Sequence, residues 1–93
     1  MPLNRVIPNP FSGATSFSYR VPEGGNRVVE VGTYDIAGRL VRHLASGMQA
    51  PGRHTVQWDG RSDAGMQAKP GIYFLRVQVG GERQVTRVIY LHP

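Results

Sequence analysis

The amino-acid sequence predicts an all-β domain, and three observations carry that prediction. Twelve glycines and seven prolines are spread over 93 residues, at intervals that suit turns between short strands. Between these turns, apolar and polar residues alternate, which is the pattern of a strand with one face in water. No segment shows the apolar periodicity of a convincing helix.

The length of the chain predicts one domain with a modest core. A chain of 93 residues buries about 60–65% of the surface that its unfolded form exposes, so its stability depends on efficient packing. The chain contains no cysteine, which excludes disulfides and thiolate metal sites. No apolar run reaches the ~20 residues of a membrane-spanning helix, and no signal-peptide pattern opens the chain. The opening Met-Pro-Leu-Asn suggests the end piece of a longer protein.

Seven strands are expected, at residues 3–7, 15–21, 27–35, 39–44, 53–58, 71–79 and 82–91. Pro8 and Pro10 close the first strand because neither can donate to a sheet ladder, and residues 9–13 are expected to bend. In the second strand Phe17 and Tyr19 share one face and serines the other. That strand is therefore predicted to lie half in water.

The third predicted strand and its turn hold three informative residues. Gly32 in mid-strand predicts a bulge or a close backbone approach. Gly38 is the expected residue with positive φ in the turn over residues 36–38. Asp35 is expected to cap this turn, because an aspartate side chain accepts hydrogen bonds from backbone groups just beyond it.

The second half of the chain predicts three further strands around two turns and a loop. After a loop expected over residues 45–52, residues 53–58 alternate and place Trp58 on the inward face. Residues 71–79 start with apolar residues on both faces, which predicts a central strand. A two-glycine turn then leads into residues 82–91, which are expected to pair antiparallel with the preceding strand.

Seven short strands in about 90 residues match an immunoglobulin-like β-sandwich of antiparallel strands in two sheets. Phe17, Tyr19, Trp58 and Tyr73 are the expected large residues of its core. Each such aromatic contributes roughly 2–3 kcal/mol on burial. The chain lacks the Cys…Trp…Cys pattern of antibody-type domains.

The net charge of +5 comes from 11 basic and 6 acidic residues, and all the basic residues except Lys69 are arginines. Basicity of this degree favours binding to nucleic acid or to an anionic surface when the charges are clustered. Here the arginines are scattered from Arg5 to Arg87 and form no basic arm. We therefore expect them on the solvated faces of the sheets, and we expect no nucleic-acid partner.

The residues predict neither catalysis nor a cofactor. His43, His54 and His92 form no H-E-x-x-H metal pair and no recognised nucleophile order. His54 has inward parity beside Trp58, so we expect it to be partly buried, whereas His92 is expected in a disordered tail. The chain is not expected to be an enzyme.

Asp59 and Asp63 lie in the loop between the fifth and sixth predicted strands. Alternating oxygen ligands suit calcium, but a full calcium loop needs more ligands and a late glutamate. No glutamate follows before Glu82. The favoured interpretation is a pair that stabilises turns, and calcium remains the alternative.

The ordered motifs resemble the C-terminal sorting domains of the type IX (Por) secretion system and the Ig-like module of the flagellar hook-capping protein FlgD. The resemblance covers about residues 9–91. The residues that carry it are Asn9, Pro10, Tyr34, Asp35, Gly38, Trp58, Asp59, Gly60, Asp63, Gly65, Gly71 and Tyr73. The family often closes on a lysine-containing tail, whereas this chain keeps its positive charge on the last strand through Arg83 and Arg87.

The resemblance implies a non-catalytic module that directs secretion or cell-surface attachment of a larger exported protein. Its implied partners are an N-terminal cargo domain, the outer-membrane secretion machinery and a surface anchor. The implied route passes through the periplasm to the cell surface or the medium. A sandwich has open strand edges that can accept another strand, and we expect Arg83 and Arg87 to steer such a partner.

Two alternatives belong to other functional classes. A carbohydrate-binding accessory module uses exposed aromatics as sugar platforms, and Phe74 and Tyr90 are expected as neighbours on an outer face. A structural assembly domain of the FlgD type binds copies of itself or filament subunits. A glycan is thus a possible partner only under the first alternative.

Overall fold

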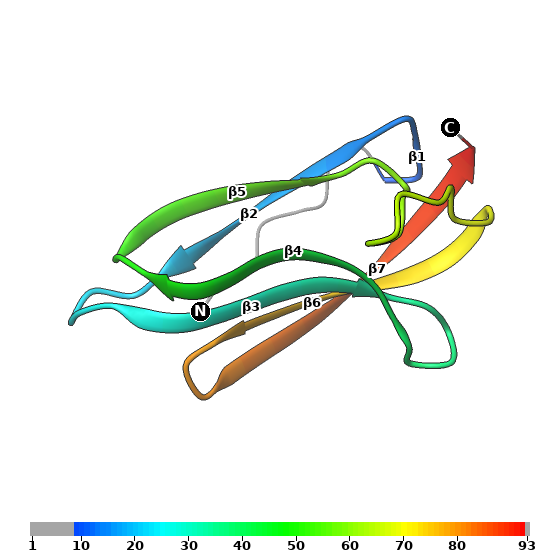
Figure 1. Ribbon diagram of the computed structural model, residues 1–93. Coiled ribbons are helices and arrows are strands. Elements are labelled where there is room, and N and C mark those ends of the chain that lie inside the picture. The colour runs from blue at the N-terminus through cyan, green and yellow to red at the C-terminus, as the bar shows by residue number, and fades with distance from the viewer. Residues whose placement is uncertain (1–8, 93) are drawn as a thin grey trace.

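The computed structural model describes residues 9–92, and all regular elements within that range are strands (Figure 1). They are β1 (Phe11–Ser12), β2 (Thr15–Val21), β3 (Arg27–Tyr34), β4 (Leu40–Gln49), β5 (Gly52–Trp58), β6 (Gly71–Val79) and β7 (Glu82–His92). The all-β prediction is therefore confirmed. Within the described range there is no helix long and apolar enough to cross a membrane.

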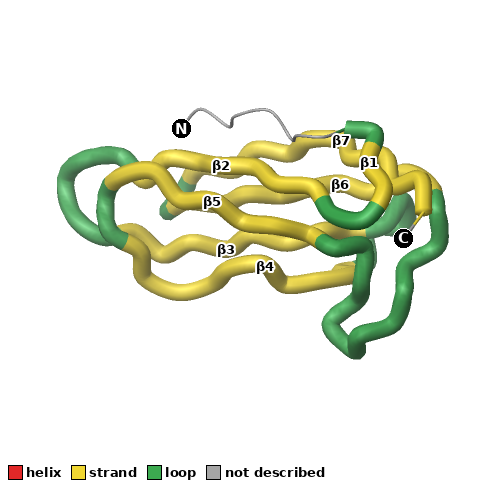
Figure 2. Tube along the Cα trace, turned by 90° about the horizontal axis from the view of Figure 1, so that it is seen from above, coloured by secondary structure: helices red, strands yellow, loops and turns green. Residues whose placement is uncertain are grey.

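The strands form two sheets that face each other, as Figure 1 shows, and Figure 2 looks down onto the smaller sheet from above. The larger sheet has the order β1-β7-β6-β3-β4, and the smaller sheet contains β2 and β5. The predicted sandwich is thus observed, with β6 in the interior of the larger sheet. The β6–β7 hairpin is antiparallel, as expected from the two-glycine turn.

The segment predicted to bend over residues 9–13 contains a short strand, β1, which pairs parallel with β7. The all-antiparallel expectation is therefore wrong at this one pair. Asn9 explains the pairing, since its side-chain amide donates to the Arg87 carbonyl at 3.1 Å and accepts from the Ile89 N–H at 3.0 Å. An asparagine amide offers the same donor and acceptor as a peptide group, so it extends the ladder along β7. The strand predicted at residues 3–7 lies outside the described residues.

Strand β4 is longer than predicted, because it covers much of the expected loop over residues 45–52. Its second half pairs with the first half of β3, from Arg27↔Gln49 to Val31↔Ala45. Gly47 lies inside this strand with φ of 105°, so a glycine that signals a loop in the sequence instead lies within an edge strand. Gly32 marks a register shift between β3 and β4, which confirms the predicted bulge.

The inner faces of the two sheets enclose one core. Phe17, Tyr19, Trp58 and Tyr73 are all buried, as predicted. The sequence did not place Phe11 there, yet its ring packs 5.6 Å from that of Trp58 and 5.0 Å from that of Tyr90. Aromatic pairs in such geometry contribute about 0.5–1.5 kcal/mol beyond burial. The short strand β1 therefore serves to bring an aromatic ring into the core.

Candidate functional site

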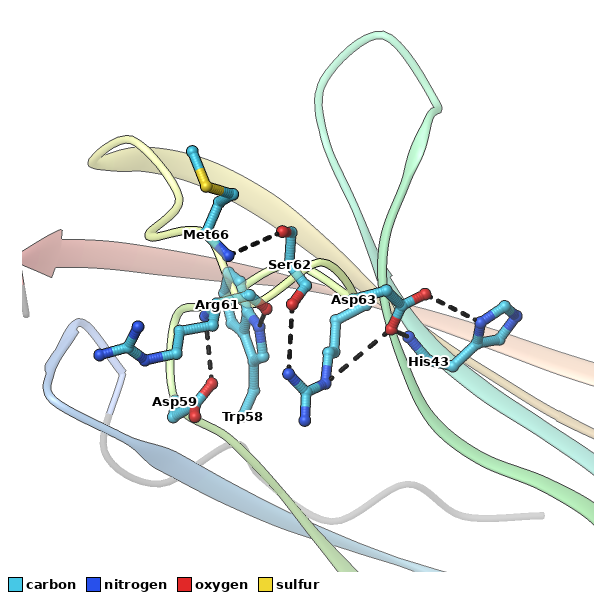
Figure 3. Close-up of polar contacts among 8 residues, drawn as sticks. His43, Trp58, Asp59, Arg61, Ser62, Asp63 and Met66 are labelled. Carbon is cyan, nitrogen blue, oxygen red and sulfur yellow. Dashed lines mark hydrogen bonds and ion pairs between the residues drawn. The ribbon is translucent and has the colours of Figure 1, made fainter.

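The loop between β5 and β6 is held to the core at its beginning. The Trp58 indole Nε1–H donates to the Arg61 carbonyl at 2.9 Å, and the Arg61 N–H donates to the Asp59 carboxylate at 3.1 Å (Figure 3). Gly60 has φ of 78°, and a Cβ there would lie 2.5 Å from the Tyr90 ring. Asp59 thus stabilises a turn as predicted, and Gly60 is required by both conformation and space.

Asp63 does not stabilise a turn of its own loop, which corrects the sequence-based interpretation. Its carboxylate accepts from the His43 N–H at 2.9 Å and contacts the His43 ring Nδ1 at 3.1 Å (Figure 3). The N–H of Asp63 donates to the Val41 carbonyl. The hydrogen bond from the His43 backbone is the main cause that lowers the pKa of Asp63. Asp63 therefore fastens the loop to β4, a long-range role that a local pattern does not reveal.

Asp59 and Asp63 bond to different partners on the two sides of the loop (Figure 3). Over residues 9–92, no group of three or more histidine, cysteine, aspartate or glutamate side chains is arranged to hold a metal ion. Within the described residues, the geometry therefore brings no third carboxylate or histidine to the calcium alternative. The loop is a structural connection between the two sheets.

The three histidines lie on three different strands. His54 is half-buried, stacks on Tyr19 at 5.6 Å and contacts the Ala50 carbonyl, which confirms its predicted partial burial. His92 belongs to β7 and contacts the Ser12 hydroxyl at 3.2 Å, so the expected disordered tail is wrong up to that residue. His43 pairs with Asp63, but the nearest candidate nucleophile in the sequence, the Ser62 hydroxyl, contacts the Met66 N–H rather than the His43 ring. A nucleophile–histidine–carboxylate arrangement is not formed there.

The turn between β3 and β4 is capped as predicted. The Asp35 carboxylate accepts hydrogen bonds from the Ala37 and Arg39 N–H groups, both at 2.9 Å, and Gly38 has φ of 83°. These bonds, the Arg39 N–H first, lower the pKa of Asp35. At the start of β6, the Tyr73 hydroxyl donates back to the Lys69 carbonyl. The family-signature residues therefore belong to turns and core rather than to a reactive centre.

The predicted partner residues separate onto two faces of the larger sheet. Phe74 lies directly opposite Arg87 on one side and Tyr34 on the other, and all three point outward. Tyr90 is only 1% exposed and belongs to the core, so its expected place on the outer face is wrong. Its register explains this, since Val88 pairs with the buried Tyr73 and Tyr90 shares the parity of Val88.

The larger sheet carries a hollow on its outer face that sequence reasoning missed. It measures about 280 Å³ and is lined by Tyr34, Asp35, Ile36, Gly38, Phe74, Arg76, Arg83 and Val85. The Arg76 guanidinium lies 4.3 Å from the centroid of the Tyr34 ring and donates a hydrogen bond to the Tyr34 hydroxyl. Two residues of this lining, Phe74 and Arg83, are partner candidates in the sequence, and strand parity in residues 71–79 places Arg76 on the same face as Phe74.

The outer edge of β7 is only partly covered by β1. Asn9, Phe11 and Ser12 take up the edge from Arg87 to His92. Among residues 9–92, no strand pairs with that edge between Glu82 and Thr86. The side chains of Arg83 and Arg87 point to the outer face of the sheet, beside this edge rather than along it.

Comparison with known families identifies the fold. The sequence profile of the FlgD Ig-like domain matches residues 6–82, which is most of the chain. FlgD from P. aeruginosa is similar in structure, with a TM-score of 0.62 and 24% identity over 90% of this chain and 70% of that one. No curated protein sequence matches the chain.

Two longer proteins of Porphyromonas gingivalis contain a similar unit. Dimeric latent PorU matches with a TM-score of 0.73 and 23% identity, over 98% of this chain and 9% of PorU. PorZ, described as an essential bacterial surface component of the type IX secretion system, matches with a TM-score of 0.65 and 18% identity, over 96% of this chain and 11% of PorZ. The chain thus spans about a tenth of the length of these proteins.

Proposed function

Because the chain belongs to the FlgD Ig-like domain family, we propose that it is a non-catalytic module that directs the export of a longer protein or its attachment to the cell surface. The observation that carries the proposal is the near-complete structural overlap with one module-sized part of PorU and of PorZ. Both are far longer than this chain, and PorZ is a surface component of a secretion system. A shared fold at this identity supports the class of module, and the role itself is our proposal.

The arrangement of side chains supports a binding role over a catalytic one. The FlgD Ig-like domain is a structural rather than an enzymatic domain. In the described part of this chain, the histidines and aspartates are engaged in turns and in contacts between strands. The remaining distinctive chemistry is the outward-facing group of arginines and aromatics on the larger sheet.

Under this proposal the parent protein passes through the periplasm and reaches the cell surface or the medium. Its partners are the cargo domain that precedes the module, the outer-membrane secretion machinery and a surface anchor. Arg83 and Arg87 are exposed on the last strand, and neither forms an ion pair with a carboxylate among residues 9–92. They are therefore available to an incoming acidic partner.

The test is a reporter protein with an export signal, fused ahead of this chain in a bacterium that has a type IX system. We expect the reporter on the cell surface or in the medium. Replacing Arg83→Glu together with Arg87→Glu should retain the reporter in the periplasm. Protease accessibility on intact cells and fractionation of periplasm and medium measure the outcome.

The matched control is Arg20→Glu with Arg53→Glu. These arginines are also exposed and lie opposite each other on the outer face of the smaller sheet, so the change in net charge is the same. Export should be retained in the control, and both variants should keep the far-UV circular dichroism of the parent. Unchanged export of the Arg83/Arg87 variant contradicts the role of these residues, and a periplasmic parent fusion contradicts the proposed function.

A structural assembly domain is the second candidate. It is favoured by the family profile over residues 6–82 and by the similarity to 70% of the FlgD chain. If the chain is such a domain, the isolated chain should self-associate as its concentration rises. Sedimentation equilibrium measures this, and a monomer at all concentrations would contradict self-assembly.

A further inference from the structure

We propose that the outer face of the larger sheet binds an acidic segment of a second protein, whose apolar side chains enter the hollow beside Tyr34, Phe74 and Arg76. The inference rests on the proposed function, because it names the surface that a secretion or anchoring partner contacts. The composition, the shape and the charge of this face support the inference. A fourth argument is that a second copy of the chain does not complement it.

The outer face of the larger sheet has the composition of an interface. Exposed apolar side chains project from it along four strands, namely those of Val28, Leu40, Met48, Ile72 and Val85. Tyr34, Phe74 and three arginines lie among them, whereas the only lysine of the chain lies in the loop before β6. Aromatics, methionine and arginine are enriched at protein interfaces, and lysine is depleted there.

The hollow on this face is small and has room for the side chains of a larger partner. Its volume of about 280 Å³ is just below the roughly 300–1,000 Å³ of small-molecule sites. Its lining includes Phe74 and also Arg76, whose guanidinium lies over the Tyr34 ring. A pocket lined by aromatics and an arginine suits one or two apolar side chains of a larger partner.

The charge of this face selects an acidic partner. Arg76, Arg83 and Arg87 point outward, and Glu30 is the one carboxylate at an outward position of β3 and β6. Asp35 borders the hollow, but its oxygens accept hydrogen bonds from its own turn and pair with Arg39. Arginine binds carboxylates through two parallel N–H groups, so a row of carboxylates between apolar residues complements the face.

A second copy of this chain does not complement the face. A symmetric dimer would place the same patch on both subunits and bring two arginine-rich surfaces of the same sign together. Like charges brought together in this way disfavour the pairing. The exposed Ile72 and Val85, on the other hand, would find no apolar surface on a nucleic-acid backbone. A protein segment with alternating acidic and apolar residues satisfies both the charge and the apolar side chains.

The test is a selection of random peptides displayed on phage against the immobilised full chain. We expect the enriched peptides to be rich in aspartate, glutamate and apolar residues. Binding of the selected synthetic peptides to the Arg83→Glu/Arg87→Glu variant should weaken by about tenfold or more. The Arg20→Glu/Arg53→Glu variant is the control and should bind within about twofold of the parent. Backbone amide shifts on binding should occur in β3, β6 and β7 and not in β2.

Any of the following outcomes would overturn the docking proposal. Basic or uncharged peptides among those enriched, shifts on the smaller sheet, or no enrichment at all contradict it. So do concentration-dependent dimers, or binding of phosphatidylglycerol vesicles without selection of acidic peptides. Export of the reporter distinguishes the two proposals: if export is normal while acidic peptides do not bind, only the docking surface is wrong. If acidic peptides bind but the fusion is never exported, only the proposed function is wrong.

Discussion

The two sheets share one core, yet their outer faces differ. On the smaller sheet the residues on the outer side of β2 and β5 are all polar, in the pairs Ser16↔Gln57, Ser18↔Thr55 and Arg20↔Arg53, and of these six only Ser18 is buried. On the larger sheet, outward positions carry arginines, aromatics and exposed aliphatic residues. A sandwich needs only its inner faces to be apolar. The fold therefore does not account for the second pattern, which the proposed binding of a partner would explain.

Because the two sheets share one core, they should unfold as one unit. The contact between Gly60 and Tyr90 is the strongest test of this expectation. Gly60 follows β5 of the smaller sheet, and Tyr90 belongs to β7 of the larger one. Gly60→Ala would bring a Cβ within 2.7 Å of three Tyr90 ring and hydroxyl atoms. Tyr90 is buried and bonded by Gln67, so it cannot move aside cheaply.

Gly65→Ala is the control for Gly60→Ala, because Gly65 has φ of 82° but nothing within 4 Å of its added Cβ. Both variants carry the strain of a left-handed conformation, roughly 1–2 kcal/mol. Gly60→Ala should lose about 1–3 kcal/mol more through overpacking. Urea unfolding should show one transition for both sheets in each variant. Equal midpoints for the two variants would contradict the packing contact between the sheets.

A second, polar contact holds the loop after β5 to β4 of the larger sheet through Asp63 and His43, and acid should weaken it. Because the hydrogen bond from the His43 N–H lowers the pKa of Asp63, the folded state favours the ionised carboxylate. This contribution is complete above the unfolded pKa of about 4 and is lost as pH falls through the lower folded pKa. Asp63→Asn should therefore flatten the loss of unfolding free energy below about pH 4. Urea titrations at several pH values measure it, and parallel pH profiles for the two proteins would refute the link.

The alternation of residues was sufficient to predict the sandwich and most strand boundaries, because each strand has one apolar face. It was insufficient for β7, where Val85 and Ile89 alternate with Val88 and Tyr90, so that both faces look apolar. Only the pairing of Val88 with Tyr73 decides which set is buried. The extension of β4 through Gly47 was missed for a similar reason, since pairing with β3 overrides the local turn signal.

The candidate site was predictable in part and for the same physical reason. Arg83, Arg87 and Phe74 were chosen from the sequence, and the structure places all three on one outward face. Tyr34 and Arg76 complete that face, but they are 42 residues apart and meet only through the pairing of β3 with β6. Asp63 likewise found its partner 20 residues away on β4. Local patterns identify turn residues well, whereas contacts across strands require the register.

The smallest expected effect on stability is also the sharpest test of the contrast between the two outer faces. Val85→Thr on the larger sheet and Thr55→Val on the smaller sheet exchange the same two β-branched residues at exposed positions. Each should change the unfolding free energy by no more than about 0.5 kcal/mol, since surface substitutions away from specific contacts rarely do more. Val85→Thr replaces an apolar methyl in the lining of the hollow by a hydroxyl and should weaken binding of the selected acidic peptides, whereas Thr55→Val should leave it unchanged. Calorimetric titration of both variants measures the difference, and equal affinities would mean that the apolar character of the larger face serves no partner.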